Sequence, residues 1–358
     1  MRPRRVAYVV GVFPKLSETF VANELAEVRR RGVEVRVLSL RRPTETLRHP
    51  VVLEAGLEAC AVYEEEKFAE VLREFRPDLL HAHFATRPTG VARELAAELG
   101  VPFTFTAHRY DIFDKPPEDF AARAAAARLF VTVSEANVHH LTGTFGVPAE
   151  RMRVIPCGVD TERFCPALAE QPKTPLIVCV ARLVKVKNQT LLLQTCAQLR
   201  DRGLTFRCVV VGDGPMRGEL ETLAKQLRLD GWVEFAGAAD QNQVLGWWQR
   251  AAIAVLTSDS EGMPVCLMEA AACALPVVAT SVGGVPELVR EGETGFLAPP
   301  GNATALADAL EKLLRDETLR SRFGLAARRV AETQLSLARQ VDQLLALWSE
   351  ILEGPKSL

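Results

Sequence analysis

Short apolar runs alternate with helical patterns along the chain, and this alternation constrains the fold most strongly. Turn residues bound each run, and a segment of helical periodicity separates it from the next one. A strand that is covered by helices on both faces of a parallel sheet appears in sequence as a continuous apolar run. The chain is therefore predicted to be α/β. In its first half the expected strands are 6–10, 33–38, 79–83, 103–106, 129–134 and 154–155.

The pattern lapses at 157–175, where proline and polar residues predict a connector between two domains. A length of 358 residues also favours two domains. We expect a Rossmann-like domain at 1–165, a second one at 166–336, and a helix near 337–354. The apolar face of that helix must be buried, either on the second domain or back on the first, to which we assign it. The second strand series is 176–180, 206–211, 233–235, 253–256, 276–279 and 296–297.

Composition excludes several classes of protein. The hydrophobic fraction of 48% and the charged fraction of 25% are ordinary for a globular protein. A net charge of −2 and an aromatic content of 6% argue against a nucleic-acid partner. The apolar runs are too short for a membrane-spanning helix, and the first one, interrupted by Gly11 and Pro14, does not resemble a signal peptide. Eight cysteines without a Cys-x-x-Cys pair predict reduced thiols in a cytoplasmic protein.

Candidate ligand-binding residues follow the predicted strands, because α/β sheets bind ligands beyond the carboxyl ends of their strands. Gly11 follows the first strand in a turn that leads to a helix expected at 18–31 and capped by Ser17, where backbone N–H groups can approach a phosphate. Arg182 and Lys187 flank the loop after strand 176–180 and can converge on one phosphate. The ordinary alternatives are a tight turn and a solvated basic loop.

The segment SDSEGMPVCLMEA at 258–270 carries the strongest signal. Pro264 is expected in the first turn of a helix, which leaves the N–H groups of Val265 and Cys266 for an anion. Glu261 precedes that helix, and Glu269 lies about two turns along it among apolar residues. A buried carboxylate needs hydrogen-bond donors, and sugar hydroxyls are suitable ones. The alternatives are a capping role for Glu261 and a core salt bridge for Glu269.

Seven residues separate Glu261 from Glu269. This spacing resembles the E-x7-E signature of the retaining glycosyltransferases of family 4, which have the GT-B fold. The resemblance extends over nearly the whole chain and is greatest to family members of the bacterial exopolysaccharide and colanic-acid type. The similar segments, in order, are VVGVFPKLSETF, VARLVKVKN, VVVGDGP, EFAG and SVGGVPELVREGETGFL.

The resemblance implies transfer of a sugar from a nucleotide-diphosphate sugar to an acceptor hydroxyl, with retention of anomeric configuration. Arg182 and Lys187 match the residues that neutralise the diphosphate leaving group. Glu269 matches the residue that holds the ribose, and Glu261 the one that holds the donor sugar. His108 matches a histidine that assists near the donor sugar. The remaining positions that match the donor site are Gly11, Gly212, Gly237, Met263, Val265 and Cys266.

No metal or other cofactor is expected. Paired cations and a helix N-terminus can stabilise a departing phosphate without a metal, and the sequence has no Asp-x-Asp pair. His81 and His83 fall on one side of a strand, but no third ligand is evident, so a structural or acceptor-side role is expected for them. The sequence departs from the family at Asn188, which replaces a glycine, and at Met263-Pro264, which replaces Phe-Gly. Because asparagine tolerates left-handed backbone, the loop at Asn188 is expected to keep its form.

Other classes of enzyme remain as alternatives to a glycosyltransferase. Gly212 to Gly218 together with Glu234 imitate a dinucleotide fingerprint, which would make the chain a nicotinamide-dependent oxidoreductase. That run follows the second strand of its domain, however, and its third glycine comes one residue late. A GT-B sugar-nucleotide epimerase or a phosphorylase is a nearer alternative.

The expected acceptor is a carbohydrate or a lipid-linked sugar. Residues 1–48 carry 11 Lys or Arg against 5 Asp or Glu. This local excess predicts weak peripheral association of the N-terminal region with an anionic membrane. The alternative is a solvated basic face.

Overall fold

The computed structural model describes residues 2–167 and 173–354. Contacts divide the chain into two units. The first runs to Gly158 and includes the C-terminal helix α14 (Leu337–Glu353), and the second runs from Val159 to Ser336. Each unit contains its own parallel sheet with helices on both faces, so the α/β prediction is confirmed.

The sheet of the first unit has seven parallel strands in the order β3-β2-β1-β4-β5-β6-β7. Its order reverses between β1 and β4, which is the doubly wound arrangement. The sequence missed β3 because this edge strand is only two residues long. The strands are β1 (Arg5–Val10), β2 (Glu34–Ser39), β3 (Ala61–Val62), β4 (Leu79–His83), β5 (Phe103–Ala107), β6 (Phe130–Thr132) and β7 (Met152–Val154).

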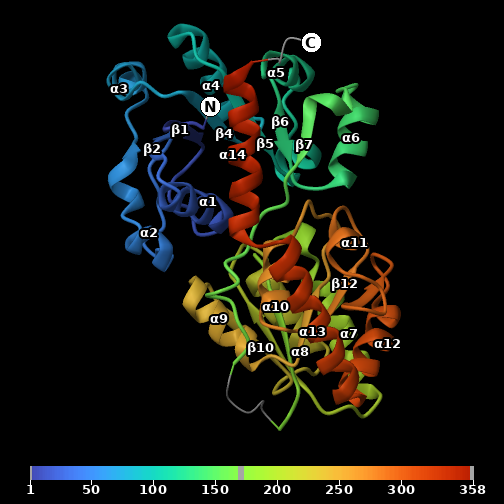
Figure 1. Ribbon diagram of the computed structural model, residues 1–358. Coiled ribbons are helices and arrows are strands. Elements are labelled where there is room, and N and C mark those ends of the chain that lie inside the picture. The colour runs from blue at the N-terminus through green and yellow to red at the C-terminus, as the bar shows by residue number, and fades with distance from the viewer. Residues whose placement is uncertain (1, 168–172, 355–358) are drawn as a thin grey trace. The chain divides into compact units, whose positions relative to one another are not determined.

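Helices α1, α2 and α14 pack on one face of this sheet, and α3 to α6 pack on the other. Figure 1 shows α14, in red, running beside α1. Val341, Leu344 and Trp348 of α14 are buried in the same core as β1. The apolar face of α14 therefore belongs to the first unit. The other helices are α1 (Thr19–Arg30), α2 (Pro50–Glu54), α3 (Phe68–Phe75), α4 (Arg87–Leu99), α5 (Phe120–Ala126) and α6 (Glu135–Phe145).

The start of α1 differs from the prediction. The helix begins at Thr19, its N-cap residue is Glu18, and no side chain caps it. Ser17 is therefore not the cap, because it lies one residue too early to reach the first free N–H groups. The turn at Gly11 is consequently separated from the helix by an irregular segment.

The second unit has six parallel strands in the order β10-β9-β8-β11-β12-β13, which reverses between β8 and β11. Helices α7, α8 and α12 contribute to one core cluster, while α13 lies beside α10 (Figure 1). The strands are β8 (Leu176–Val180), β9 (Arg207–Val211), β10 (Val233–Gly237), β11 (Ile253–Leu256), β12 (Val277–Thr280) and β13 (Gly295–Ala298). The helices are α7 (Gln189–Asp201), α8 (Arg217–Gln226), α9 (Gln241–Arg250), α10 (Val265–Ala272), α11 (Val285–Leu288), α12 (Ala303–Arg315) and α13 (Glu317–Gln334).

The boundary between the units lies before the expected residue 165. Val159 pairs with Ser336, and the carbonyl of Phe164 accepts a hydrogen bond of 2.7 Å from Arg328. These contacts attach 159–164 to the second unit. Within the connector expected at 157–175, residues 168–172 lie outside the described residues.

Among the described residues, no helix is both long enough and apolar enough to cross a membrane.

Candidate functional site

Two loops meet where the strand order of the second unit reverses. One follows β8 and contains Lys187, and the other follows β11 and contains Asp259. The backbone N–H of Asp259 donates to the carbonyl of Val186 at 2.8 Å, and the side-chain amide of Asn188 donates to Asp259 at 2.7 Å. Neighbouring parallel strands end at one edge of a sheet, so these loops from distant parts of the sequence become a single surface.

Lys187 and Glu261 form an ion pair on this surface. Lys187 Nζ lies 2.5 Å from Glu261 Oε1, and Ser258 Oγ donates to the same oxygen at 2.6 Å. Their side chains are 17% and 6% exposed, so the pair is largely shielded from water. Glu261 does not cap α10, since the N-cap residue of that helix is Pro264 and no side chain caps it. The structure therefore excludes the capping alternative.

Arg182 lies on the same loop as Lys187 but has different surroundings. Its side chain is exposed and forms no ion pair with any carboxylate of the described residues. The backbone holds the loop in place, because the Arg182 carbonyl accepts a hydrogen bond of 2.9 Å from Gln189 Nε2. The guanidinium is thus free for an anionic ligand, whereas the Lys187 ammonium is already paired.

Asn188 connects this loop to α7. Its φ is +45°, and its side chain accepts a hydrogen bond of 3.2 Å from the N–H of Leu191 as the N-cap of the helix. Asn188 therefore adopts the left-handed backbone that asparagine tolerates, and its side chain caps α7.

The start of α10 offers backbone donors. Pro264 occupies the N-cap position, one residue before the predicted first-turn position, and Met263 beside it is buried. Val265 and Cys266 begin the helix, and within the described part of the chain their N–H groups have no backbone acceptor. Burial raises the pKa of the Cys266 thiol far above its usual value, so the thiol is neutral. At the start of α10, the groups that can bind an anion are therefore the backbone N–H groups of Val265 and Cys266.

Glu269 is a buried carboxylate with few partners. It is 5% exposed, and among the described residues its one hydrogen-bond donor is the Trp248 indole N–H, at 3.5 Å. Burial raises its pKa to about 7, against smaller opposing effects of that bond and of Arg163. Within the described residues no salt bridge reaches Glu269, so the alternative of a core salt bridge is not supported. A buried polar group with so few donors is costly unless a ligand supplies more.

Glycines bring the loops of this surface together. At Gly212, with φ of +139°, an added Cβ would lie 2.0 Å from the Ala181 carbonyl oxygen, and its N–H donates to Gly237 at 2.8 Å. At Gly283, with φ of +51°, a Cβ would lie 1.7 Å from the carbonyl oxygen of Glu261. Glycine is therefore required at positions 212 and 283, because a Cβ there would collide with a neighbouring backbone carbonyl. At Gly11 an added Cβ would meet nothing within 4 Å, so no neighbouring residue requires that glycine.

His108 is positioned in the first unit, directly after β5. It is 8% exposed, and its Nε2 lies 3.1 Å from Nδ1 of His83, which ends β4. The rings of Phe20 and Phe84 lie 4.6 and 4.8 Å from its ring. Burial, and then the neighbouring His83, lowers the pKa of His108 well below its usual value. The imidazole is therefore neutral at physiological pH.

Glu24 of α1 completes a cluster with His81 and His83. Atoms of the three side chains that can bind a metal lie within 4.8 Å of one another. Hydrogen bonds already engage these atoms: both ring nitrogens of His81 contact threonine hydroxyls, at 2.7 and 3.1 Å, and Glu24 contacts His83 at 3.2 Å. The sequence analysis missed Glu24, although a carboxylate on the apolar face of α1 is the same signal that drew attention to Glu269.

Asp111 is a second residue that the sequence analysis did not identify. It is fully buried and accepts hydrogen bonds from the N–H groups of Ala85 and His108 at 2.6 and 2.9 Å. Burial raises its pKa to about 7. Asp111 therefore ties together the loops after β4 and β5 and fixes the backbone of His108.

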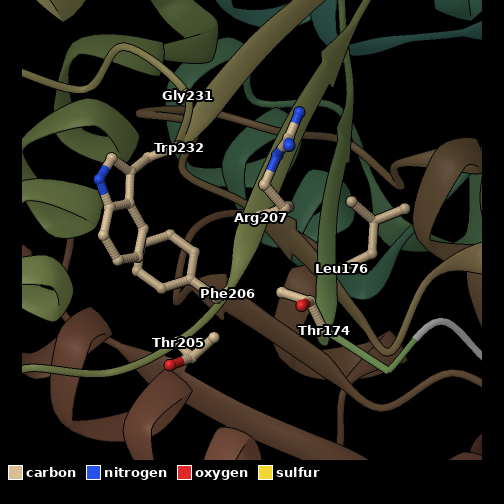
Figure 2. A pocket seen from close by; sticks show the side chains of 7 residues that line it. All are labelled: Thr174, Leu176, Thr205, Phe206, Arg207, Gly231 and Trp232. Carbon is tan, nitrogen blue, oxygen red and sulfur yellow. The ribbon is translucent and has the colours of Figure 1, made fainter.

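A cavity of about 400 Å³ lies elsewhere in the second unit (Figure 2). Leu176 and Arg207, which begin β8 and β9, lie on its wall, so the cavity is at the amino ends of these strands. Arg182 and Glu261 follow the carboxyl ends. The cavity is thus separate from the predicted site. It is lined by Thr174, Leu176, Thr205, Phe206, Arg207, Gly231 and Trp232.

Comparisons with protein families place the chain among sugar-transferring enzymes. A family model described as "Glycosyltransferase Family 4" matches residues 17–163, and one described as "Glycosyl transferases group 1" matches 160–330. The chain is 30% identical to the putative colanic acid biosynthesis glycosyltransferase WcaL of Escherichia coli K12, covering 86% of this chain and 89% of that protein. It is 32% identical to the amylovoran biosynthesis glycosyltransferase AmsK of Erwinia amylovora, covering 77% and 69%.

Solved structures share the fold. A glycosyltransferase from Rickettsia africae ESF-5 has a TM-score of 0.82 at 20% identity and covers 99% of each chain. Anabaena HepE, solved in complex with UDP-glucose, has a TM-score of 0.82 at 18% identity, with 96% of this chain and 99% of that one covered. At such identities the likeness is one of architecture.

Proposed function

Because the chain belongs to family 4 of the glycosyltransferases and has their GT-B fold, we propose that it transfers a sugar from a nucleotide-diphosphate sugar to an acceptor hydroxyl, retaining anomeric configuration. The observation that carries the donor assignment is Glu269. This carboxylate is 5% exposed and receives a single hydrogen bond, of 3.5 Å, from the part of the chain that the structure describes. The two hydroxyls of a ribose would supply the missing donors and would favour the ionised form.

The remaining donor contacts are proposed for the loops around Glu269. Arg182, which lacks a carboxylate partner in the described structure, would bind the diphosphate together with the N–H groups of Val265 and Cys266. Lys187 would neutralise the leaving phosphate, and Glu261, which is paired to it, would accept a hydrogen bond from the donor sugar. For Gly11, Gly212, Gly237 and Met263 we retain the donor-site positions that the family match implies.

Catalysis is proposed to proceed without a metal. The bond to the sugar weakens as negative charge develops on the departing phosphate oxygen, and fixed cations and backbone dipoles stabilise that charge. For His108 we keep the role implied by the family, which is assistance at the donor sugar from a neutral imidazole.

The relatives suggest the pathway. WcaL and AmsK are described as enzymes of colanic acid and amylovoran biosynthesis, so we propose that this chain acts in exopolysaccharide synthesis, with a carbohydrate or lipid-linked sugar as acceptor. HepE is described in complexes with UDP and UDP-glucose, which makes these the first donors to test. Eight free cysteines favour a cytoplasmic enzyme.

A thermal-shift screen of nucleoside diphosphates and their sugars tests the donor assignment. We expect stabilisation by one nucleotide family and then movement of radiolabel from that nucleotide sugar into an acceptor fraction. Label that stays in a rearranged nucleotide sugar would indicate an epimerase, and phosphate-dependent cleavage of a glycoside would indicate a phosphorylase. Binding of reduced nicotinamide nucleotides with no nucleotide-sugar binding would contradict the proposal.

Weak membrane association of the N-terminal region remains a separate proposal. Several of its cations are neutralised within the chain, because Lys15, Arg30, Arg31, Arg42 and Arg48 pair with nearby carboxylates. Leu53 nearby is 62% exposed. We expect salt-sensitive sedimentation with anionic vesicles and none with neutral vesicles. Equal recovery with both kinds at low salt would refute this association.

A further inference from the structure

We propose that Ser258 is a positioning residue for Glu261: its hydroxyl holds one oxygen of the carboxylate, so that the other oxygen is presented to the donor sugar. The inference rests on the proposed function for the identity of the ligand as a nucleotide sugar. The orientation of the carboxylate follows from hydrogen bonds within the second unit alone.

One oxygen of Glu261 carries both of the bonds that its side chain makes to the protein. Lys187 Nζ and Ser258 Oγ lie 2.5 and 2.6 Å from this oxygen, Oε1. Each oxygen of a carboxylate has two lone pairs, so these two donors fill the capacity of Oε1. A further donor, such as a sugar hydroxyl, must therefore bind Oε2.

The second oxygen, Oε2, is available to a ligand. It has no hydrogen-bond partner among residues 2–167 and 173–354. It is also not one of the buried side-chain atoms that lack a partner, so it retains access to solvent although the side chain of Glu261 is largely buried. A hydroxyl that arrives from solvent meets Oε2 first.

The two donors on Oε1 differ in what else they can bind. Lys187 is partly exposed, has a flexible stem and carries three ammonium protons, so a phosphate of the ligand would share it with Glu261. Ser258 is fully buried and has a single hydroxyl proton, which Glu261 already receives. Ser258 is thus the donor that holds Glu261 in the same orientation before and after the phosphate binds.

The backbone around Ser258 is itself held in place. The Ser258 carbonyl accepts a hydrogen bond of 2.5 Å from the hydroxyl of Thr280, the last residue of β12. At the other end of the loop, the carbonyl of Gly262 accepts a bond of 3.0 Å from the N–H of Gly284. The 258–262 loop is therefore attached at both ends to β12 and the turn that follows it. Such preorganisation lowers the entropy lost when a ligand binds.

Isothermal titration with UDP-glucose and with UDP tests the inference, because UDP lacks the sugar that Glu261 would bind. If the thermal-shift screen identifies another nucleotide, the corresponding pair is used. Ser258→Ala should weaken the binding of UDP-glucose about 10-fold and leave the Kd for UDP within about two-fold, because only the hydrogen bond to the sugar is lost. The control is Thr195→Val, which removes another fully buried hydroxyl, one that donates to the Leu191 carbonyl at 2.8 Å within α7. It should leave both affinities unchanged.

A double-mutant cycle distinguishes positioning from a purely structural role. A positioning residue acts only through the group that it orients, so in a Glu261→Ala background Ser258→Ala should weaken UDP-glucose binding no further. A residue that only stabilised the loop would weaken this binding in both backgrounds. Losses that multiply in the double variant would therefore overturn the proposal.

Equal losses of affinity for UDP and UDP-glucose in Ser258→Ala would also overturn it. If Ser258→Ala does not fold, Ser258→Cys takes its place, because a thiol is similar in size but is a weak donor. It should show the same selective loss, and unchanged binding of UDP-glucose would contradict the inference. A wild-type protein that binds no nucleotide sugar contradicts the proposed function and this inference with it. Wild-type binding that a folded Ser258→Ala leaves unchanged contradicts this inference alone.

Discussion

The two sheets have equivalent strand orders, but the polar side chains near the two points of reversal differ in how many protein partners they have. In the first unit, His83 at the end of β4 is hydrogen-bonded to both Glu24 and His108, and Glu24 is also bonded to Tyr8 and Gln340. Beyond β8 and β11 of the second unit, Arg182 lacks a carboxylate within the described residues and Glu269 receives one long bond. One architecture therefore supports a preorganised network in the first case and an incomplete binding surface in the second. The unfilled hydrogen-bond capacity of the second unit is where we propose that a charged ligand binds.

The largest effect on activity is expected at Arg182, which has no carboxylate partner among the described residues. Arg182→Ala should lower kcat about 100- to 1000-fold, because a cation that stabilises charge on the leaving phosphate is lost. Steady-state kinetics with the donor found in the screen measures this. Arg207→Ala, which removes a half-exposed arginine at the opposite end of the same sheet, is the matched control and should leave kcat unchanged. Near-normal turnover of both Arg182→Ala and Glu269→Ala would refute the assigned site.

Gly283→Ala should destabilise the loop that contains Glu261, because the new side chain collides with backbone. The new Cβ cannot fit 1.7 Å from the Glu261 carbonyl oxygen, and φ of +51° is unfavourable for alanine. We expect the free energy of unfolding of the second unit to fall by about 2 to 4 kcal/mol. Gly246→Ala, inside α9 with nothing within 4 Å of the added Cβ, should instead be neutral or stabilising in chemical denaturation. Equal destabilisation by both changes would contradict the packing argument.

Glu269→Gln should separate binding from stability. In the folded protein the pKa of Glu269 is about 7, against an ordinary value of 4.5. The folded state thus holds a proton that the unfolded state has released, and the free energy of unfolding falls as pH rises between these values. At pH 8 the free energy of unfolding of the ligand-free variant should exceed that of the wild type by about 3 kcal/mol, and at pH 4 this advantage should vanish. Denaturation at both pH values tests this.

The same variant should bind the nucleotide about 10-fold more weakly, since an amide offers one acceptor where a carboxylate offers two. Isothermal titration at pH 8 measures the affinity. Tighter or unchanged binding would show that Glu269 does not hold the ribose.

The smallest effect is expected from chelation. The ligand-binding atoms of Glu24, His81 and His83 are already hydrogen-bonded, and Arg182 with the start of α10 would stabilise the phosphate. Activity should stay within about two-fold after treatment with EDTA. Loss of activity that Mg²⁺ or Zn²⁺ restores would show that a metal contributes to one of the two sites.

The sequence predicted most strands because each buried parallel strand is a continuous apolar run. It also identified the loops of the second unit, because Arg182, Lys187 and Glu261 each follow such a run by a few residues. The network of the first unit could not be found in that way. Gln340 and Glu24 are 316 positions apart, and no local spacing brings them together. Ser17 was a wrong prediction for a different reason, since helix boundaries depend on the backbone path that leads into the first turn.

The position of helix α14 affects the order in which the two units can fold during synthesis. Trp348 packs against Tyr8 with ring centroids 6.1 Å apart and is fully buried, so a core that starts with the earliest strand is completed only by one of the latest helices. On the ribosome, the residues of the second unit emerge as one continuous stretch and can fold as a unit before α14 is synthesised. Throughout that time, the part of the first unit's core that α14 covers must remain exposed beside α1. During synthesis, the part of the chain made first is therefore the last to become native.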